Sequence, residues 1–392
     1  MADWQLWVRG TDREWLGVID DELSFTATPR HLELGAWQIT VQAGTPSADL
    51  LLEGAGVVLL DGDGTVLMSG PKRPMERSND ASPDGDTITV TGVDDTAALA
   101  RIVYPSPGTA ITSSGTTHSA EHWTRTGPGE DVLRDLIDTQ AGPEALSGRR
   151  VPGLVIPESE GRGRELTSQL RLDKLLEAGW AIAEAVGLGF HVVQDEETTD
   201  LHLRIYEPRD LADSVRFGAH LGNLASYSYE ASPPEVTDVI VAAGGEGTDR
   251  MFFHHQRRDD MWPDVIVEEV IDARDLALEP GDGDEDWVDP EEGAEQRATE
   301  RLDEGEAKAS VEFVPIDTDA LTYGADYHLG DRVTAEIDIG DVTNIIREVV
   351  YTRDPTSGEV VAPAIGEAQD QPQIYKRVAR IRSDVDKLQN RR

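Results

Sequence analysis

Residues 57–69, Val57-Val58-Leu59-Leu60-Asp61-Gly62-Asp63-Gly64-Thr65-Val66-Leu67-Met68-Ser69, contain two short apolar runs separated by an Asp/Gly turn. Asp and Gly tolerate positive φ, so the turn can reverse the chain without steric strain at Cβ. The apolar runs have the length and composition of strands. This stretch predicts a tight β-hairpin and sets the expectation of a β-rich fold.

Similar strand-like runs fill the sequence around the hairpin. They are Gln5 to Arg9, Leu16 to Ile19, Leu23 to Ala27, Leu32 to Leu34, Trp37 to Val41 and Thr87 to Thr91. A helix is expected from Asp94 to Arg101, and the Gly/Ser/Thr/Pro-rich residues Ser106 to Gly129 then predict a linker or a long loop. We therefore expect a first small β-barrel-like domain over residues 1–105.

The middle of the chain changes to helical periodicity. Val132, Leu133, Leu136 and Ile137 have helical spacing, and a longer apolar series runs from Leu172 to Val186. Alternating strands are expected at 188–194 and 201–206, joined by a polar turn. Residues 106–235 therefore predict a linker followed by an α+β domain.

Strand patterns return after Pro233-Pro234. We expect them at 237–243, 265–271, 311–315, 332–337 and 344–352, which predicts a second β domain over residues 236–368. Residues 279–295 are almost all Asp, Glu, Gly and Pro, too polar to bury a core, and predict an acidic exposed loop. A helix is expected at 295–309. The fold class is thus mainly β with α+β: two β-barrel-like domains flank an α+β region.

The last residues, 369–392, predict a basic C-terminal helix. From Gln373 to Arg392 there are seven cations against two acids, and apolar residues recur with spacing 4, 3, 4, 3. This spacing is typical of a coiled-coil seam, and its β-branched residues favour three or more strands. A single amphipathic helix docked on its own domain is the alternative. The seam residues are Ile374, Val378, Ile381, Val385 and Leu388.

Composition excludes several classes of function. The 392 residues include 76 acidic and 35 basic side chains, a formal net charge of −41, and this field repels nucleic-acid phosphates. Sequence-specific nucleic-acid binding is not expected. The chain has no cysteine, which excludes a disulfide scaffold and a thiolate metal site. It has no apolar run of about 18 residues and no signal-peptide pattern, so we expect no membrane insertion and no export.

Motifs for catalysis and cofactor binding are weak. The segment Gly245 to Arg250 lacks the third glycine of a dinucleotide fingerprint, and Asp282, Asp284 and Asp286 begin a calcium-like loop that lacks its glycine and its final glutamate. The adjacent His254 and His255 point to opposite faces of a strand, and no third ligand has the required spacing. We predict no catalytic residue, metal site or cofactor, and we assign no ligand-binding residue.

Three phrases of the sequence resemble one family. The first is Trp37 to Val41 with Thr87 to Gly92; the second is Tyr206-Glu207-Pro208-Arg209-Asp210, followed by Val215 to Phe217 and Leu221-Gly222-Asn223-Leu224; the third is Tyr323 to Val333. Together they resemble the tail-tip or baseplate-hub (minor tail) proteins of siphophages that infect actinobacteria, similar in architecture to the hubs of contractile tails. At single positions, Arg209 and Asp210 predict a local ion pair, and Gly222 and Asn223 predict positive-φ backbone.

The resemblance implies a non-enzymatic virion protein of the tail tip, assembled in the host cytoplasm. It implies a homotrimeric ring that joins the tail tube or distal tail protein to a tip fibre or spike, near the tape measure protein, and lets DNA pass. The acidic charge would keep DNA from sticking, or would only keep the protein soluble. We expect no appended lytic or sugar-binding module. Two rivals remain: a cell-wall or polysaccharide hydrolase with Trp123, Trp180 or Trp262 as sugar platforms, and a host glycan- or receptor-binding module.

Overall fold

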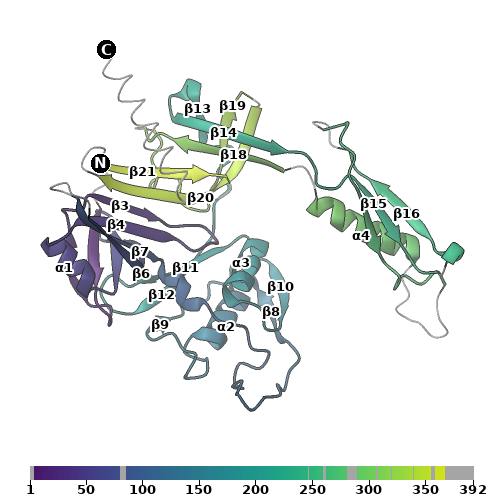
Figure 1. Ribbon diagram of the computed structural model, residues 1–392, viewed down its shortest axis with the longest axis horizontal. Helices are drawn as coiled ribbons and strands as arrows, with labels where there is room; N and C mark the ends of the chain where they lie inside the picture. The colour runs from purple at the N-terminus through teal and green to yellow at the C-terminus, as the bar shows by residue number, and fades with distance from the viewer. Residues whose placement is uncertain are drawn as a thin grey trace. The chain divides into compact units, whose positions relative to one another are not determined.

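The computed structural model describes residues 4–79, 85–245, 247–258, 262–279, 289–305, 308–318, 320–338, 340–354 and 358–366. The chain forms two compact units (Figure 1). The first contains Met1–Tyr227 and Glu312–Arg392, and the second contains Ser228–Val311. The predicted C-terminal helix at 369–392 lies outside the described residues.

One sheet of 13 strands runs through the first unit and includes strands from both ends of the sequence. The central pairing joins β3 (Ser24–Thr28) to β20 (Gly340–Asp354), with Ala27 opposite Tyr351. The other strands are β1 (Gln5–Arg9), β2 (Trp15–Ile19), β4 (Ala36–Gln42), β5 (Gly56–Leu60), β6 (Val66–Asn79), β7 (Asp86–Val93), β13 (Arg216–Gly218), β14 (Leu224–Ser232), β18 (Lys308–Pro315), β19 (Arg332–Ile337) and β21 (Gly358–Ile365). The chain leaves the first unit through β14 and returns through β18.

The hairpin at residues 57–69 is confirmed. Leu60 of β5 pairs with Val66 of β6, and the Asp61 carboxylate accepts hydrogen bonds from the backbone N–H groups of Asp63 and Thr65. Gly64 has φ of 86°, the left-handed backbone for which glycine was expected. All five residues of β5 are buried, and the strand lies between β6 and β1.

Two local predictions in this region are wrong. The expected strand Leu32 to Leu34 is a turn in which Leu32 has φ of 52°, and its apolar side chains pack on the neighbouring core instead. The helix α1 (Pro46–Glu53) was not predicted. It begins with a Thr45 side chain that accepts from the Ala48 N–H, and Pro46 occupies its first turn, where a missing N–H costs nothing.

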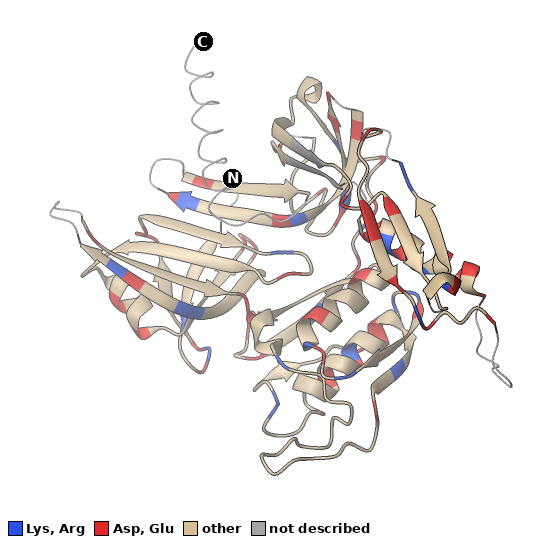
Figure 2. Cartoon of the chain, turned by 45° about the vertical axis from the view of Figure 1, so that its right-hand side comes forward, with Lys and Arg blue, Asp and Glu red and all other residues tan. Residues whose placement is uncertain are grey.

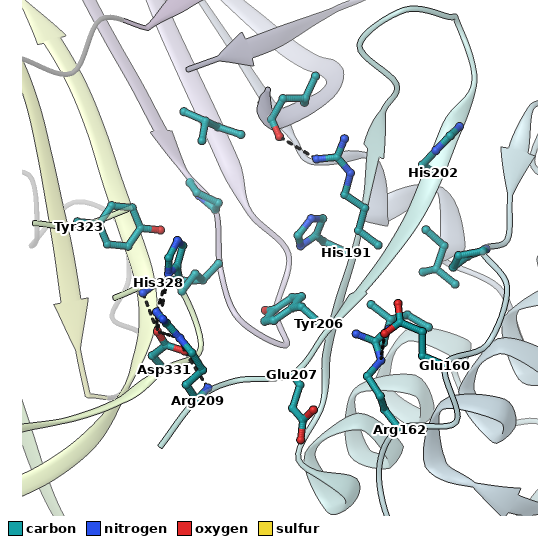
Figure 3. A pocket seen from close by; sticks show the side chains of 18 of the residues that line it. Glu160, Arg162, His191, His202, Tyr206, Glu207, Arg209, Tyr323, His328 and Asp331 are labelled. Atoms are coloured by element: carbon teal, nitrogen blue, oxygen red, sulfur yellow. Dashed lines mark hydrogen bonds and ion pairs between the residues drawn. The ribbon is translucent and has the colours of Figure 1, made fainter. Parts of the chain in front are cut away.

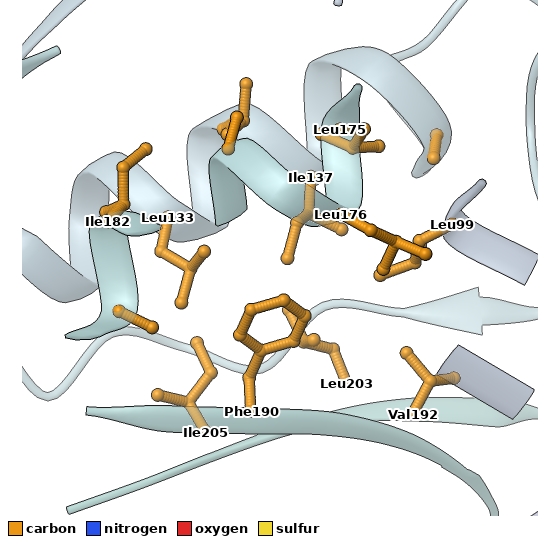
Figure 4. Close-up of a cluster of buried hydrophobic side chains, with 14 of the residues drawn as sticks. Leu99, Leu133, Ile137, Leu175, Leu176, Ile182, Phe190, Val192, Leu203 and Ile205 are labelled. Atoms are coloured by element: carbon orange, nitrogen blue, oxygen red, sulfur yellow. The ribbon is translucent and has the colours of Figure 1, made fainter. Parts of the chain in front are cut away.

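The α+β part of the first unit follows its predicted helical periodicity. Apolar residues of α2 (Gly129–Ala141) and α3 (Leu175–Val186) face one side of the sheet formed by β11 (Gly189–Gln194), β12 (Leu201–Tyr206) and β9 (Leu154–Val155). Figure 4 shows Phe190 of β11 among Leu133, Ile137 and Leu203. A second, two-stranded sheet pairs β8 (Trp123–Pro128) with β10 (Glu165–Leu170). The helix expected at 94–101 is a 3-10 turn, η1 (Asp95–Leu99).

The second unit is a three-stranded sheet with one helix. Strand β15 (Asp238–Ala242) pairs antiparallel with β16 (Phe252–Gln256) and parallel with β17 (Glu268–Asp272). Helix α4 (Pro290–Glu304) packs on the sheet through Ala294, Ala298 and Leu302. Its start corrects the acidic loop predicted at 279–295 and the helix predicted at 295–309: Asp289 caps the Glu291 N–H and Pro290 opens the first turn, so the helix begins before residue 295.

These elements confirm the mainly β fold class with added helices. The domain boundaries predicted at 105, 235 and 368 stay a prediction. The strand pairs nevertheless cross those boundaries, because β3 and β20 belong to one sheet, while residues 228–311 form their own compact unit. No helix among the described residues is both long enough and apolar enough to span a membrane.

Candidate functional site

Two of the sequence phrases, Tyr206 to Asp210 and Tyr323 to Val333, meet in the first unit. The Arg332 N–H donates to the Arg209 carbonyl at 2.9 Å, and the Leu211 N–H donates to the Arg332 carbonyl at 2.8 Å. The Arg209 guanidinium binds the Asp331 carboxylate with its closest N···O distance at 2.6 Å. Asp331 also accepts the His328 N–H at 2.8 Å and is only 3% exposed, so one buried carboxylate joins both segments.

The predicted local ion pair between Arg209 and Asp210 is wrong. Asp210 instead pairs with Arg332 at 3.0 Å, and Arg209 pairs with Asp331. Each of the two adjacent side chains reaches a partner 122 residues away in the sequence. The charges therefore fix a long-range contact between two segments and not a single turn.

A cavity of about 710 Å³ lies where these segments meet β12 and the loop 157–162 (Figure 3). Apolar and aromatic surfaces alternate with charged ones along its wall. The lining includes Glu160, Arg162, His191, His202, Tyr206, Glu207, Arg209, Tyr323, His328 and Asp331. A second cavity of about 830 Å³ shares Leu67, Tyr323, His328 and Tyr351 with the first. We call the two together the junction groove.

The histidine and tyrosine side chains in the groove wall and behind it are uncharged at neutral pH. The Tyr206 hydroxyl lies 2.8 Å from His31 Nδ1, and burial, followed by the positive charge of Arg347, lowers the pKa of His31 to about 4. Burial, with Arg204 nearby, likewise lowers the pKa of His191 to about 4. Burial raises the pKa of Tyr206 and raises that of Tyr323 to about 12. A neutral His31 shares a hydrogen bond with the Tyr206 hydroxyl, and the lining presents neutral polar groups beside its ion pairs.

One wall of the groove is held by a buried carboxylate. Glu130, at the start of α2, is fully buried and accepts hydrogen bonds from the Arg162 side chain and from the N–H groups of Glu160 and Arg162. Burial opposes ionisation, but these donors together hold the pKa of Glu130 below its usual value. The loop 157–162 is therefore fixed in place, which gives the groove a preformed wall.

The segment after Arg209 contains the predicted turn at Gly222 and Asn223. Gly222 has φ of 72° as predicted, but Asn223 does not adopt positive φ. Its amide instead bridges the turn: the side-chain oxygen accepts from the Gly218 N–H and the side-chain nitrogen donates to the Arg216 carbonyl, both at 2.9 Å. This interaction ties the turn to β13, which pairs with β19.

We expect Asn223→Ala to lower the free energy of unfolding by about 1–3 kcal/mol, because the buried Gly218 N–H loses its acceptor. Asn223→Asp, which keeps an oxygen in place, should cost less. Urea unfolding of both variants checks this order. An alanine variant as stable as the parent would show that water replaces the amide.

Other residues considered from the sequence lie away from the groove or outside the described residues. Trp123 is 5% exposed and belongs to the α+β core, while Trp180 is partly buried against it. His254 Nε2 lies 2.9 Å from the Asp238 carboxylate in the second unit. The calcium-like aspartates 282, 284 and 286 are outside the described residues. Within the described ranges, no three His, Asp or Glu side chains are arranged to hold a metal ion.

Comparison with known sequences places the chain in a family. The profile of the family described as siphovirus ReqiPepy6 Gp37-like protein matches residues 4–367. The chain belongs to this family. No curated protein sequence matches.

Comparison with solved structures concerns the fold. The 43 kDa tail protein of prophage MuSo2 from Shewanella oneidensis superposes with a TM-score of 0.51 at 13% identity, over 93% of this chain and 98% of that one. A tail protein from Neisseria meningitidis MC58 gives a TM-score of 0.49 at 12% identity, over 93% and 96%. The family match and the shared fold of the MuSo2 protein confirm the siphophage tail-protein resemblance that the sequence phrases indicated.

From the sequence, the two phrases that line the groove were interpreted as turns and core strands. Their contact was not predicted, and neither was a role for His31, His191 or Arg162. A hint was present, since each phrase combines tyrosine, arginine or histidine and aspartate in a turn region. Such side chains can form hydrogen-bonded networks, but nothing in the sequence pairs one turn with the other.

Proposed function

We propose that this phage tail structural protein is a hub subunit of the tail tip, in which three copies form a ring between the tail tube and the distal tip. The pairing of β3 with β20 carries the proposal, since it sets a β region from the N-terminal part of the chain beside one from the C-terminal part in a single sheet. Each copy would then contribute two adjacent β regions, and a ring of three copies would have six. Such a ring has the pseudo-sixfold shape needed to match a sixfold tube to a threefold tip.

The proposed partners are other tail proteins. The ring would contact the tail tube or distal tail protein on one side and a fibre or spike on the other, with the tape measure protein nearby. The proposed location of the protein is the virion, after assembly in the host cytoplasm. Three copies carry three times the charge of −41, and an acidic inner wall would repel DNA phosphates during ejection. Figure 2 marks Asp and Glu positions in red in both units of the chain.

The ion pairs of the groove and the packing of the tryptophans both favour a non-enzymatic role. The groove holds its arginines in ion pairs with Glu130, Glu196 and Asp331, so these cations act as structural links. A hydrolase with a Trp123 sugar platform is disfavoured because that ring is packed in the core. The rival of a cell-wall hydrolase is tested by incubating the purified chain with host cell walls and measuring released sugar and peptide.

The deciding experiment is the solution mass of the purified chain by light scattering, at moderate salt, with and without Gln373–Arg392. We expect about three times 42.8 kDa for the full chain at high concentration. A trimer that survives truncation would keep the hub and remove the predicted coiled-coil seam. A strict monomer at high concentration would contradict a ring that forms without other tail proteins.

A further inference from the structure

The sheet of the second unit has one covered face and one bare face. Val239 and Val241 of β15 are buried against α4. Because side chains alternate along a strand, Ile240 points to the opposite face, and strand register places Val270 of β17 and His254 of β16 beside it. Phe252 lies one row further along the same face, opposite Ala242. The described residues place no helix or strand of the unit over this face.

This bare face carries the most exposed apolar side chains of the described residues. Val270 is 62% exposed and Phe252 is 60% exposed. Ile266, in the segment just before β17, is 65% exposed. Polar side chains such as His254 and Asp272 share this face, so the exposed apolar side chains among them mark a place where a partner can pack.

The negative net charge of the second unit favours a positively charged partner. Between Ser228 and Val311 the sequence has 25 acidic and seven basic residues, a net charge of −18 in 84 residues. Glu268 and Asp272 lie at the two ends of β17, on the same face of the sheet as Val270. A face with exposed apolar side chains among acidic ones attracts a segment that has an apolar stripe and basic flanks.

One segment of this chain has that chemistry. Residues 373–392, outside the described structure, carry seven cations and two acids, a net charge of +5, and an apolar stripe with helical spacing. As a helix, the stripe from Ile374 to Leu388 would be about 21 Å long. A five-residue strand is about 17 Å long, so the stripe matches the length of the sheet face.

We propose that the bare face of the β15–β16–β17 sheet binds the basic segment Gln373–Arg392 of a second copy of this chain. The apolar stripe covers Ile240, Phe252 and Val270, and the arginines and lysines lie against the acidic edges. The sheet then has a helix on each face. In a ring, each copy gives its segment to one neighbour and receives a segment from the other, which is a heterologous contact that can close. Taking the segment from a neighbouring copy rests on the proposed ring.

Binding of the segment to the sheet face can be tested without forming the ring. A fluorescent peptide of residues 370–392 is titrated with the chain truncated after residue 369, and anisotropy is read at about 0.15 M salt. We expect saturable binding that weakens at least tenfold with Phe252→Ser and Val270→Ser together. The matched control is Met75→Ser with Ile111→Ser, two exposed apolar positions in the other unit, which should leave the affinity unchanged.

A second peptide distinguishes the contribution of the apolar stripe to binding from that of the positive charges. A peptide with Ile381→Ser and Val385→Ser keeps all seven cations and should bind at least tenfold more weakly. Absence of peptide binding, equal binding to the Phe252/Val270 variant, or equal binding of the two peptides would each overturn the proposal. These readings do not depend on the mass of the chain, so they fail or succeed separately from the hub.

The source of the segment is tested with cysteines, which the natural sequence lacks. Full chains carrying Val270→Cys and full chains carrying Val385→Cys are mixed and oxidised mildly. A disulfide-linked dimer that forms well above the level given by Met75→Cys with Val385→Cys supports exchange between copies. Equal dimer yields in the two mixtures would overturn it.

Discussion

Replacing Arg9 by methionine should lower the free energy of unfolding by about 3–5 kcal/mol. Arg9 of β1 is 4% exposed and makes two hydrogen bonds to Asp95 of η1, at 2.6 and 2.7 Å. It also donates to the Gln194 side chain of β11 at 3.0 Å. Removing the guanidinium leaves a buried carboxylate with one remaining side-chain donor, Ser69. An unpaired buried charge is strongly destabilising.

Urea unfolding followed by tryptophan fluorescence measures this loss, because six of the eight tryptophans lie in the first unit. The matched control is Arg77→Met. Arg77 also binds an aspartate, Asp86, with two hydrogen bonds, but its side chain is 61% exposed, so the midpoint should hardly move. Equal effects of the two substitutions would show that burial does not set the strength of the Arg9 interaction.

The stability of the first unit should fall as the pH drops from about 6.5 to about 4, with His31 contributing about 3 kcal/mol. His31 is 5% exposed and its pKa is lowered to about 4, mainly by burial and then by Arg347. In the unfolded chain the histidine becomes protonated as the pH falls through about 6.5, whereas in the folded chain it becomes protonated only near pH 4. The contribution is therefore complete above pH 6.5 and is lost as the pH falls through this window.

His31→Gln removes the titrating group and should flatten the dependence of unfolding free energy on pH between 6.5 and 4. The control is His220→Gln, since the His220 side chain is 64% exposed and its replacement should leave the slope nearly unchanged. Denaturant titrations at four pH values supply the slopes. If the parent and the His31→Gln protein lose stability in parallel, His31 is not the group that couples protonation to unfolding, and His191 becomes the next to test.

The sequence by itself determined the local structure of this protein. The Asp61–Gly64 turn chemistry gave the hairpin, and apolar spacing located α2, α3 and the strands β11 and β12 to within a few residues. These features depend on residues that are close in the chain, so propensity and periodicity suffice. Where the local pattern misled, as at Leu32–Leu34, apolar residues served packing with a neighbouring core and not a strand.

Only the tertiary structure decided which distant segments meet. Alternation in β3 and β20 shows which faces are apolar but not that the two strands pair across more than 300 residues. The same holds for Arg209: its charge predicts a partner, and the adjacent Asp210 was the nearest candidate, yet chain direction sends it to Asp331. The pairing of distant segments depends on how whole layers of strands and helices pack, and the weak preferences of single residues do not decide it. The sequence therefore specified the elements and their apolar faces, while the folded chain selected the partners that form the groove.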